Sequence, residues 1–241
     1  MKEIKMILAA AALTAAVVGT ADATLITIGE ATYQGSQYNL IWDNDGPNGS
    51  VVWLDYSNPV NTWGDQVAWA TGLGGNLTVA LNPGYTITWT DSDWRLPTTV
   101  DGLFVNGYDG TTTAGYNITN SEFGHLYYTE LGNQAFFDTS GNFQPDWGLK
   151  NVGDFENLNA YWYWSGTDSA DSPGTAWNFN TSSGYQNESA KATYTLLGMA
   201  VRSGQVEATP VPEPSNLLLV GSGLGVLAGV VRKRRSPKFQ Q

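Results

Sequence analysis

Tyr161-Trp162-Tyr163-Trp164-Ser165-Gly166-Thr167 is the stretch of sequence that decides the fold. Successive side chains of a β-strand point to opposite faces of a sheet, which places Tyr161 and Tyr163 on one face and Trp162 and Trp164 on the other. Because both faces are aromatic, the stretch predicts a central strand that is covered on both sides. It can offer an aromatic platform to a sugar only where one face reaches solvent.

Other strand patterns lie on both sides of this stretch. Short apolar or alternating runs, separated by turn residues, occur at residues 25–28, 38–42, 51–54, 85–89, 176–180, 184–187 and 194–202. We expect hairpins from Leu40 to Leu54 and from Ala176 to Asn187, because a turn-rich segment joins the two runs of each pair. The last strands are expected to complete an antiparallel end to the domain.

Helical periodicity predicts two or three short helices. The first covers residues 61–70, where apolar side chains recur every three or four positions, and the second runs from Ser121 to a stop at Gly132. A third is expected after Pro97, with Thr98 as its cap. With long loops between these elements, the sequence predicts an α+β fold of mostly antiparallel strands.

The composition limits the kind of partner. The chain has no cysteine, which excludes disulfides and thiol chemistry. Residues 24–209 carry 19 acidic and 4 basic side chains, a formal net charge of −15. Such a body is repelled by nucleic acid and anionic lipid, and it favours cations or neutral glycans. The alternative is that the acidity only keeps an exported protein soluble.

The loop Asp43-Asn44-Asp45-Gly46-Pro47-Asn48-Gly49 is a candidate cation site. Its alternating oxygen ligands suit a hard cation, and we take Asp43, Asn44 and Asp45 as candidate calcium ligands. The loop lacks the downstream glutamate of an EF-hand. Because the same residue types are ordinary turn formers, turn chemistry alone is the alternative reading.

His125 is the only histidine of the chain. One histidine cannot build a multi-histidine metal site, and its neighbours on the expected helical face are apolar or aromatic. We therefore expect a packed, hydrogen-bonded histidine rather than a catalytic one.

Four motifs carry a resemblance to a known family. They are Trp94-Arg95-Leu96-Pro97-Thr98, the 161–167 stretch, Ala176-Trp177-Asn178-Phe179-Asn180 and Ala200-Val201-Arg202-Ser203. In this order the motifs resemble the Lcl C-terminal domain, a family of largely unknown function. That family is similar to the C-type-lectin-like fold shared with formylglycine-generating enzymes. The cysteines on which that enzyme activity relies are absent here, and fold alone does not imply function.

The motif residues are expected to be structural. This set comprises Trp94, Arg95, Leu96, Pro97, Trp164, Ser165, Trp177 and Arg202. We expect the guanidinium groups of Arg95 and Arg202 to pair with carboxylates or carbonyl oxygens, because planar donors of this kind favour such partners.

Both termini carry export features. Residues 1–23 have a charged start, an apolar core and the small-x-small site Ala21-Asp22-Ala23, which predicts a cleavable signal peptide. Near the other end, residues 217–231 form an apolar run of about 22 Å as a helix, which is short for a bilayer. A basic cluster follows and favours the cytoplasmic side. That cluster is Arg232, Lys233, Arg234 and Arg235.

With Pro212-Glu213-Pro214 in front of the apolar run, this tail resembles the PEP-CTERM sorting signal of Gram-negative bacteria. The resemblance implies recognition by an inner-membrane exosortase, cutting near the motif, and release to the cell surface or extracellular matrix. The expected organisation is a signal peptide, a lectin-like domain, a linker, the sorting signal with its transmembrane helix, and a cytoplasmic tail. Their bounds are 1–23, 24–204, 205–211, 212–235 and 236–241.

Two classes of function stay open. The first is a non-enzymatic surface or matrix protein that binds polysaccharide, which suits export and a chain with 10 tryptophans and 12 tyrosines. The second is a secreted glycan-active enzyme, which needs two carboxylates flanking a cleft. The pairs Asp91/Asp93 and Asp43/Asp45 are the candidates. Closely spaced pairs of this kind more often cap loops or bind cations, so we favour the binding protein.

Overall fold

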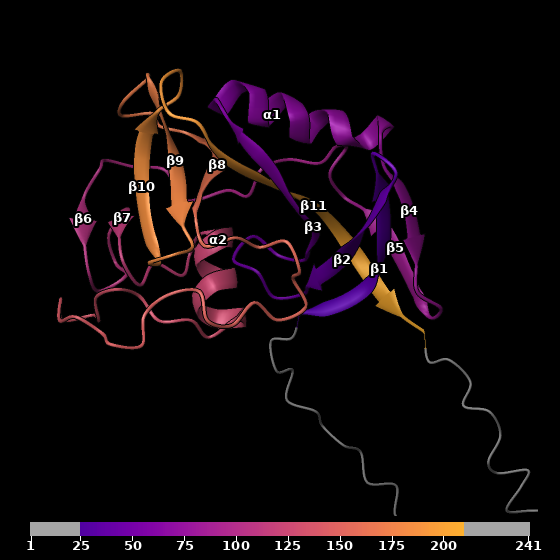
Figure 1. Ribbon diagram of the computed structural model, residues 1–241, viewed down its shortest axis with the longest axis horizontal. Helices are drawn as coiled ribbons and strands as arrows, with labels where there is room; N and C mark the ends of the chain where they lie inside the picture. The colour runs from indigo at the N-terminus through magenta and orange to yellow at the C-terminus, as the bar shows by residue number, and fades with distance from the viewer. Residues whose placement is uncertain (1–24, 210–241) are drawn as a thin grey trace, which may run out of the picture.

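β8 (Trp162–Asp168) lies inside a mixed β-sheet, between two other strands, as the sequence predicts for its aromatic stretch. The computed structural model describes residues 25–209, drawn in colour in Figure 1. The other elements are β1 (Ile26–Tyr33), β2 (Ser36–Asp43), β3 (Val51–Asn61), α1 (Trp63–Gly72), the short 3₁₀ helix η1 (Leu73–Gly75), β4 (Thr78–Leu81), β5 (Tyr85–Trp89), β6 (Asn106–Gly107), β7 (Ala114–Gly115), α2 (Glu122–Gly124), the π-helix η2 (His125–Glu130), β9 (Thr175–Asn180), β10 (Tyr185–Ala190) and β11 (Leu196–Ala208).

The sheet is organised around the long strand β11. The strand order is β4-β1-β2-β3-β11-β8-β9-β10-β7-β6, and β5 pairs with the far half of β11. Both predicted hairpins are confirmed, since β2 pairs with β3 and β9 pairs with β10, each antiparallel. The predicted antiparallel end is confirmed for β9 with β10 and for β11 with β3 and β5, but Leu197 of β11 pairs in parallel with Tyr163 of β8.

The body extends beyond its predicted end at residue 204. β11 continues through Gln205 to Ala208, and these residues pair with β5 from Thr88 back to Tyr85. The backbone groups that a free linker would expose are therefore satisfied inside the sheet. The linker predicted for residues 205–211 is corrected accordingly over its first four residues.

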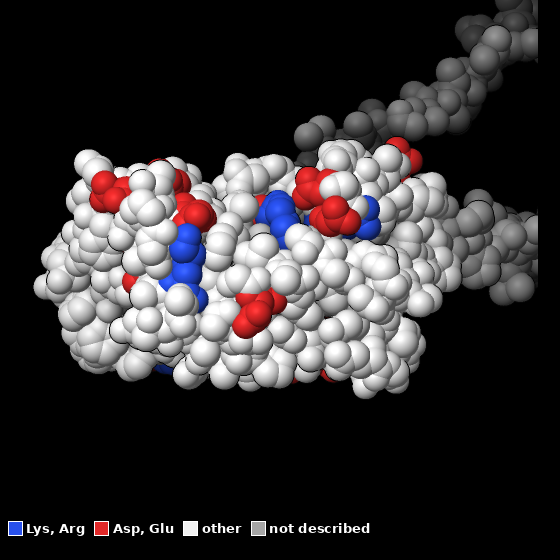
Figure 2. Space-filling model, turned by 90° about the horizontal axis from the view of Figure 1, so that it is seen from above, with Lys and Arg blue, Asp and Glu red and all other residues white. Residues whose placement is uncertain are grey.

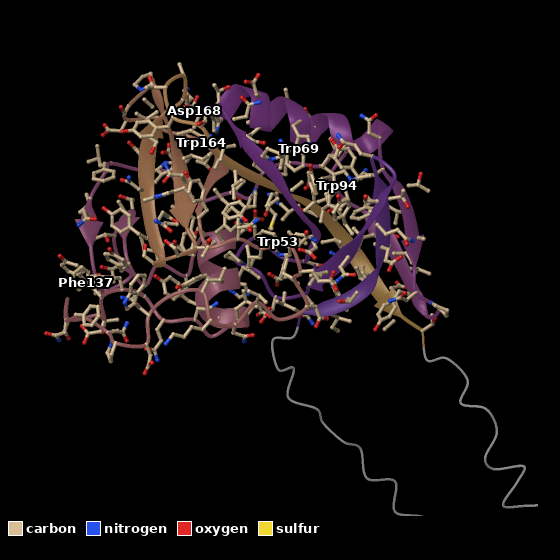
Figure 3. All side chains as sticks on the ribbon, viewed as in Figure 1. Trp53, Trp69, Trp94, Phe137, Trp164 and Asp168 are labelled. Atoms are coloured by element: carbon tan, nitrogen blue, oxygen red, sulfur yellow. The ribbon has the colours of Figure 1, made fainter. Side chains whose placement is uncertain are left out.

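A hydrophobic core lies on each face of the central strands (Figure 3). On the α1 side, Trp164 packs in one cluster with Trp94, whereas Tyr163, its neighbour in β8, packs with Trp53 in the cluster on the α2 side. All four side chains are almost fully buried. The aromatic side chains on the two faces of β8 thus belong to two separate hydrophobic cores, one on each face of the sheet.

Gln66 fixes α1 to the sheet. The helix starts at the Thr62 cap, whose hydroxyl accepts the N–H of Asp65. One turn later the buried amide of Gln66 donates to the carbonyl oxygens of Pro59 at 2.8 Å and Leu196 at 2.9 Å. A Cβ on Gly198 would collide with the Gln66 amide, so only glycine allows this close approach of helix and strand.

The helix expected after Pro97 is not formed. The carbonyl oxygen of Pro97 accepts the N–H of Gly166 and the hydroxyl of Ser165, and the N–H of Thr98 donates to Glu122 Oε2. Because these backbone groups are bonded to other elements, they are not available for helical hydrogen bonds. Residues 96–105 therefore form an irregular segment, of which residues 97 and 99 bond to β8.

The terminal predictions lie outside the described residues. They concern the signal peptide at 1–23 and the sorting signal with its apolar run at 217–231. Within residues 25–209, no helix is long and apolar enough to cross a membrane.

Candidate binding groove and candidate metal centre

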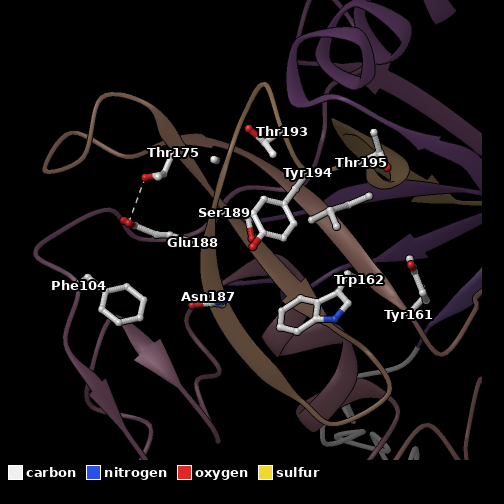
Figure 4. A pocket seen from close by; sticks show the side chains of 12 residues that line it. Phe104, Tyr161, Trp162, Thr175, Asn187, Glu188, Ser189, Thr193, Tyr194 and Thr195 are labelled. Atoms are coloured by element: carbon white, nitrogen blue, oxygen red, sulfur yellow. Dashed lines mark hydrogen bonds between the residues drawn. The ribbon is translucent and has the colours of Figure 1, made fainter.

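An open groove lies where the strands β8 and β10 meet the loop before β11 (Figure 4). Its volume is about 660 Å³, within the range of small-ligand sites. Aromatic rings from three separate segments line it, and three of them are well exposed: Phe104 at 43%, Tyr161 at 47% and Tyr194 at 55%. Trp162, the first residue of β8, adds a half-buried ring.

Two of the rings are held by aromatic neighbours. Phe104 stacks on the buried Trp177, with ring centroids 6.4 Å apart. Trp162 meets the edge of Tyr185 of β10 at 6.2 Å. Contacts of this kind stabilise a ring beyond the area it buries, so these two side chains are ordered before any ligand arrives.

Polar side chains complete the lining. Asn187, Glu188 and Ser189 come from β10, and Thr175 comes from the start of β9. The Thr175 hydroxyl lies 3.1 Å from Glu188 Oε2 (Figure 4) and 3.0 Å from the carbonyl oxygen of Ser172, so the two acceptors share its proton. The groove thus combines aromatic faces with amide, hydroxyl and carboxylate groups.

The cationic side chains of residues 25–209 are all engaged. Lys150 and Lys191 form ion pairs with Asp146 and Asp168, and both arginines have carboxylate or carbonyl partners. Figure 2 shows that charged groups are sparse on the face seen there and that most cationic groups lie beside acidic ones. The described surface therefore offers no free cationic patch to an anionic partner.

Arg95 and Arg202 make the pairings expected from the sequence. Arg95 donates to both oxygens of the buried Glu122, at 2.7 and 2.9 Å, and contacts Asp91 at 3.3 Å. Arg202 donates to the carbonyl oxygens of Asp91 and Ser92 and lies over the Trp89 ring. The two arginines are partly exposed, whereas the other motif residues are buried: Trp94, Leu96, Pro97, Trp164, Ser165 and Trp177.

The two candidate carboxylate pairs differ in their surroundings. Asp91 accepts the N–H of Ser203 and pairs with Arg95, whereas Asp93 is exposed and accepts the Ser92 hydroxyl. Neither belongs to the groove lining. In the other pair, Asp43 ends β2 and is buried, and Asp45 is 47% exposed.

Asp43 and Asp45 face two side chains from the π-helix. His125 Nε2 lies 3.7 Å from Asp43 Oδ1, 3.4 Å from Asp45 Oδ1 and 3.3 Å from Glu130 Oε1. One ligand atom from each of the four residues can be chosen so that all lie within 4.8 Å of one another. Asn44, the third residue proposed for calcium, is exposed.

The π-helix explains why His125 and Glu130 meet. In an α-helix, residues five apart project about 140° away from each other. Here the N–H of Leu131 donates to the carbonyl oxygen of Leu126, five residues back, and the wider turn brings positions 125 and 130 to the same side. π-turns of this kind are rare and occur frequently at functional sites.

Burial and mutual repulsion oppose ionisation of the carboxylates in this cluster. Burial, together with the nearby charges of Asp43 and Asp45, raises the pKa of Glu130 to about 7. Burial also raises the pKa of Asp43, although His125 and the N–H of Asp45 act in the opposite direction. Several negative charges therefore converge on one place that is largely shielded from water.

The sequence predicts only part of this cluster. It indicates the two aspartates as ligands and predicts a packed His125, and no pattern in it points to Glu130. The structure buries His125, but its Nε2 has no hydrogen-bond partner among residues 25–209. Acidic residues on a helix with a histidine five positions away are not a recognised signal, because the α-helical repeat separates them.

No protein-family model, no curated protein and no solved structure matches the chain. We therefore infer its function from the groove and the side-chain cluster themselves.

Proposed function

We propose that this protein is an exported surface or matrix protein whose lectin-like α+β body binds neutral polysaccharide in the groove. The observation that carries the proposal is the set of exposed rings of Phe104, Tyr161 and Tyr194 around polar side chains. Sugars present apolar C–H faces that stack on aromatic rings, and hydroxyl groups that bind planar amides and carboxylates. An acidic body with its cations engaged also favours an uncharged ligand.

The groove supports binding better than hydrolysis. Glycoside hydrolysis uses two carboxyl groups on opposite sides of the scissile bond. Among the residues that line the groove, Glu188 is the one carboxylate, and it already accepts a hydrogen bond from Thr175. A glycan-active enzyme remains the alternative. Product formation from matrix polysaccharide at high protein concentration would favour it.

Removing an exposed ring should weaken glycan binding. We expect Tyr194→Ala to lower the affinity for the best-bound oligosaccharide about tenfold, because loss of one stacking contact costs about 1–1.5 kcal/mol. Tyr194→Phe keeps the ring and should keep most of the affinity. Titration calorimetry with oligosaccharides selected on a glycan array, using the full-length chain, measures the difference.

A matched pair of phenylalanines supplies the control. Phe104→Ala should weaken binding, whereas Phe143→Ala should not, because Phe143 is 56% exposed but lies outside the groove. Equal effects of the two substitutions would contradict the location of the site. A blank result on both glycan arrays and matrix polysaccharides would contradict the function.

For the tail, the resemblance to the sorting signal supports export, transient anchoring and processing by an exosortase. We expect the wild-type protein to be found at the cell surface or in the matrix, shortened near Pro212. Glu213→Ala should instead accumulate as the full-length chain in the inner membrane. Fractionation with mass analysis of the native protein tests this, and a full-length wild-type protein in the inner membrane would refute it.

A further inference from the structure

The cluster of Asp43, Asp45, His125 and Glu130 is separate from the groove and independent of the glycan proposal. We propose that these four residues bind one divalent transition-metal ion, of which zinc is the representative. The ion would join the loop after β2 to the π-helix, two segments that are about 80 residues apart in sequence.

The spacing of the ligand atoms fits a four-coordinate ion. A tetrahedral zinc site with bonds of about 2.0–2.1 Å has neighbouring ligand atoms about 3.3–3.4 Å apart. His125 Nε2 lies 3.3 and 3.4 Å from the oxygens of Glu130 and Asp45, and 3.7 Å from that of Asp43. These three distances are close to the tetrahedral value, and the remaining separations are within 4.8 Å, so the carboxylates would have to move together by up to about 1.5 Å to surround one ion.

The ligand types favour a transition metal over calcium. Calcium takes six to eight oxygen ligands, whereas an imidazole nitrogen beside carboxylates is typical of zinc and related ions. The sequence proposed calcium on Asp43, Asn44 and Asp45. The structure places the Nε2 atom of His125 3.7 Å from Asp43 Oδ1 and 3.4 Å from Asp45 Oδ1, which changes the ion that the loop suits.

The buried side chain of Glu130 supports a bound cation independently of the number of acidic residues in the cluster. Its side chain is only 1% exposed, and Oε1, which points at His125, has no hydrogen-bond partner among the described residues. His125 Nε2 is likewise buried and without a hydrogen bond. Leaving a buried polar atom unpaired costs about 1–3 kcal/mol, and more for a charged group. A bound cation would satisfy both atoms at once.

Protonation of His125 is the competing explanation. An imidazolium would place one positive charge among three carboxylates, whereas a divalent ion supplies two charges and direct bonds to all four groups. The two explanations differ in what happens to the imidazole when metal is added. Because the chain contains one histidine, its ring signals can be observed without overlap.

The test uses the full-length protein, purified through a tag that contains no histidine. Titration with zinc should show one ion per chain and should shift the ring ¹⁵N signals of His125. Asp45→Ala, which changes an exposed ligand, should weaken zinc binding at least about 100-fold, beyond the 10–100-fold typical of residues outside the ligand shell. His125→Gln should do the same.

Asp93→Ala is the matched control. Like Asp45, Asp93 is the exposed second aspartate of an Asp-x-Asp sequence. Its replacement by alanine should leave the zinc affinity unchanged. The proposal is overturned if zinc does not bind at millimolar concentration, if calcium binds more tightly than zinc, or if zinc binds without moving the His125 signals. It is also overturned if the two alanine variants bind zinc equally well.

Discussion

Replacement of Glu122 by glutamine is expected to destabilise the protein by about 3 kcal/mol, the low end of the range for breaking a buried ion pair. The carboxylate accepts two hydrogen bonds from Arg95 and a third from the N–H of Thr98 at 2.7 Å. A glutamine offers one acceptor oxygen, and its NH₂ group would face another donor. Asp91 remains beside Arg95, which limits the loss. For a body of this size, the thermal midpoint should fall by about 6–12 °C.

A surface pair in the same protein is the control for this substitution. Asp146 pairs with Lys150 at 2.9 Å, but both side chains are more than half exposed. Asp146→Asn should therefore change the stability by less than about 1 kcal/mol. Chemical denaturation of the three proteins measures both values. If Glu122→Gln and Asp146→Asn had the same small effect, the ion pair would not support the packing of segment 94–98 against α2.

The second large effect that we expect is the stabilisation of the folded protein by zinc. At a free concentration 100 times the dissociation constant, a ligand that binds only the folded state stabilises it by about 2.7 kcal/mol. This corresponds to a rise of about 5–11 °C in the thermal midpoint. Glu130→Gln should abolish most of this gain. Without metal, the same variant should be more stable than the wild type at pH 8.

The greater stability expected for Glu130→Gln without metal follows from the raised pKa of Glu130. Burial and the charges of Asp43 and Asp45 raise this pKa to about 7. Above that pH the ionised carboxylate opposes folding, so an uncharged amide relieves the repulsion. Glu30→Gln, the same change at an exposed position of β1, should alter neither quantity. A lower metal-free stability for Glu130→Gln would instead show that Glu130 pairs with a protonated His125.

Local patterns predicted much of the fold but not the pairing of distant strands. The alternation in β8 identified a strand with two buried faces, and the turn-rich segments identified both hairpins. The parallel contact between Leu197 and Tyr163 has no signal in the local sequence, because it depends on how the loops bring two distant segments together. The missing helix after Pro97 has a similar cause: partners on β8 and α2 outweigh the capping pattern.

The two candidate sites show the same difference between features that neighbouring residues predict and features that depend on distant segments. Asp43 and Asp45 were identified because they are close in sequence, whereas Glu130 depends on a π-turn that residue periodicity does not reveal. The groove gathers Phe104, Tyr161 and Tyr194 from segments that are far apart in the chain. Aromatic composition indicated that rings were available, but only the folded arrangement determines which of them reach solvent.

β11 has a mechanical consequence for a protein held by its C-terminus. The strand is bonded to β3 and β8 along its first part and to β5 along its last part, and it leads directly to Thr209. A pull on the tail is transmitted along the strand axis. Strand separation in this direction requires several backbone hydrogen bonds to shear together, whereas an edge hairpin peels one bond at a time. If the body binds glycan while it is anchored, as we propose, a load on the glycan would be resisted by the middle of the sheet.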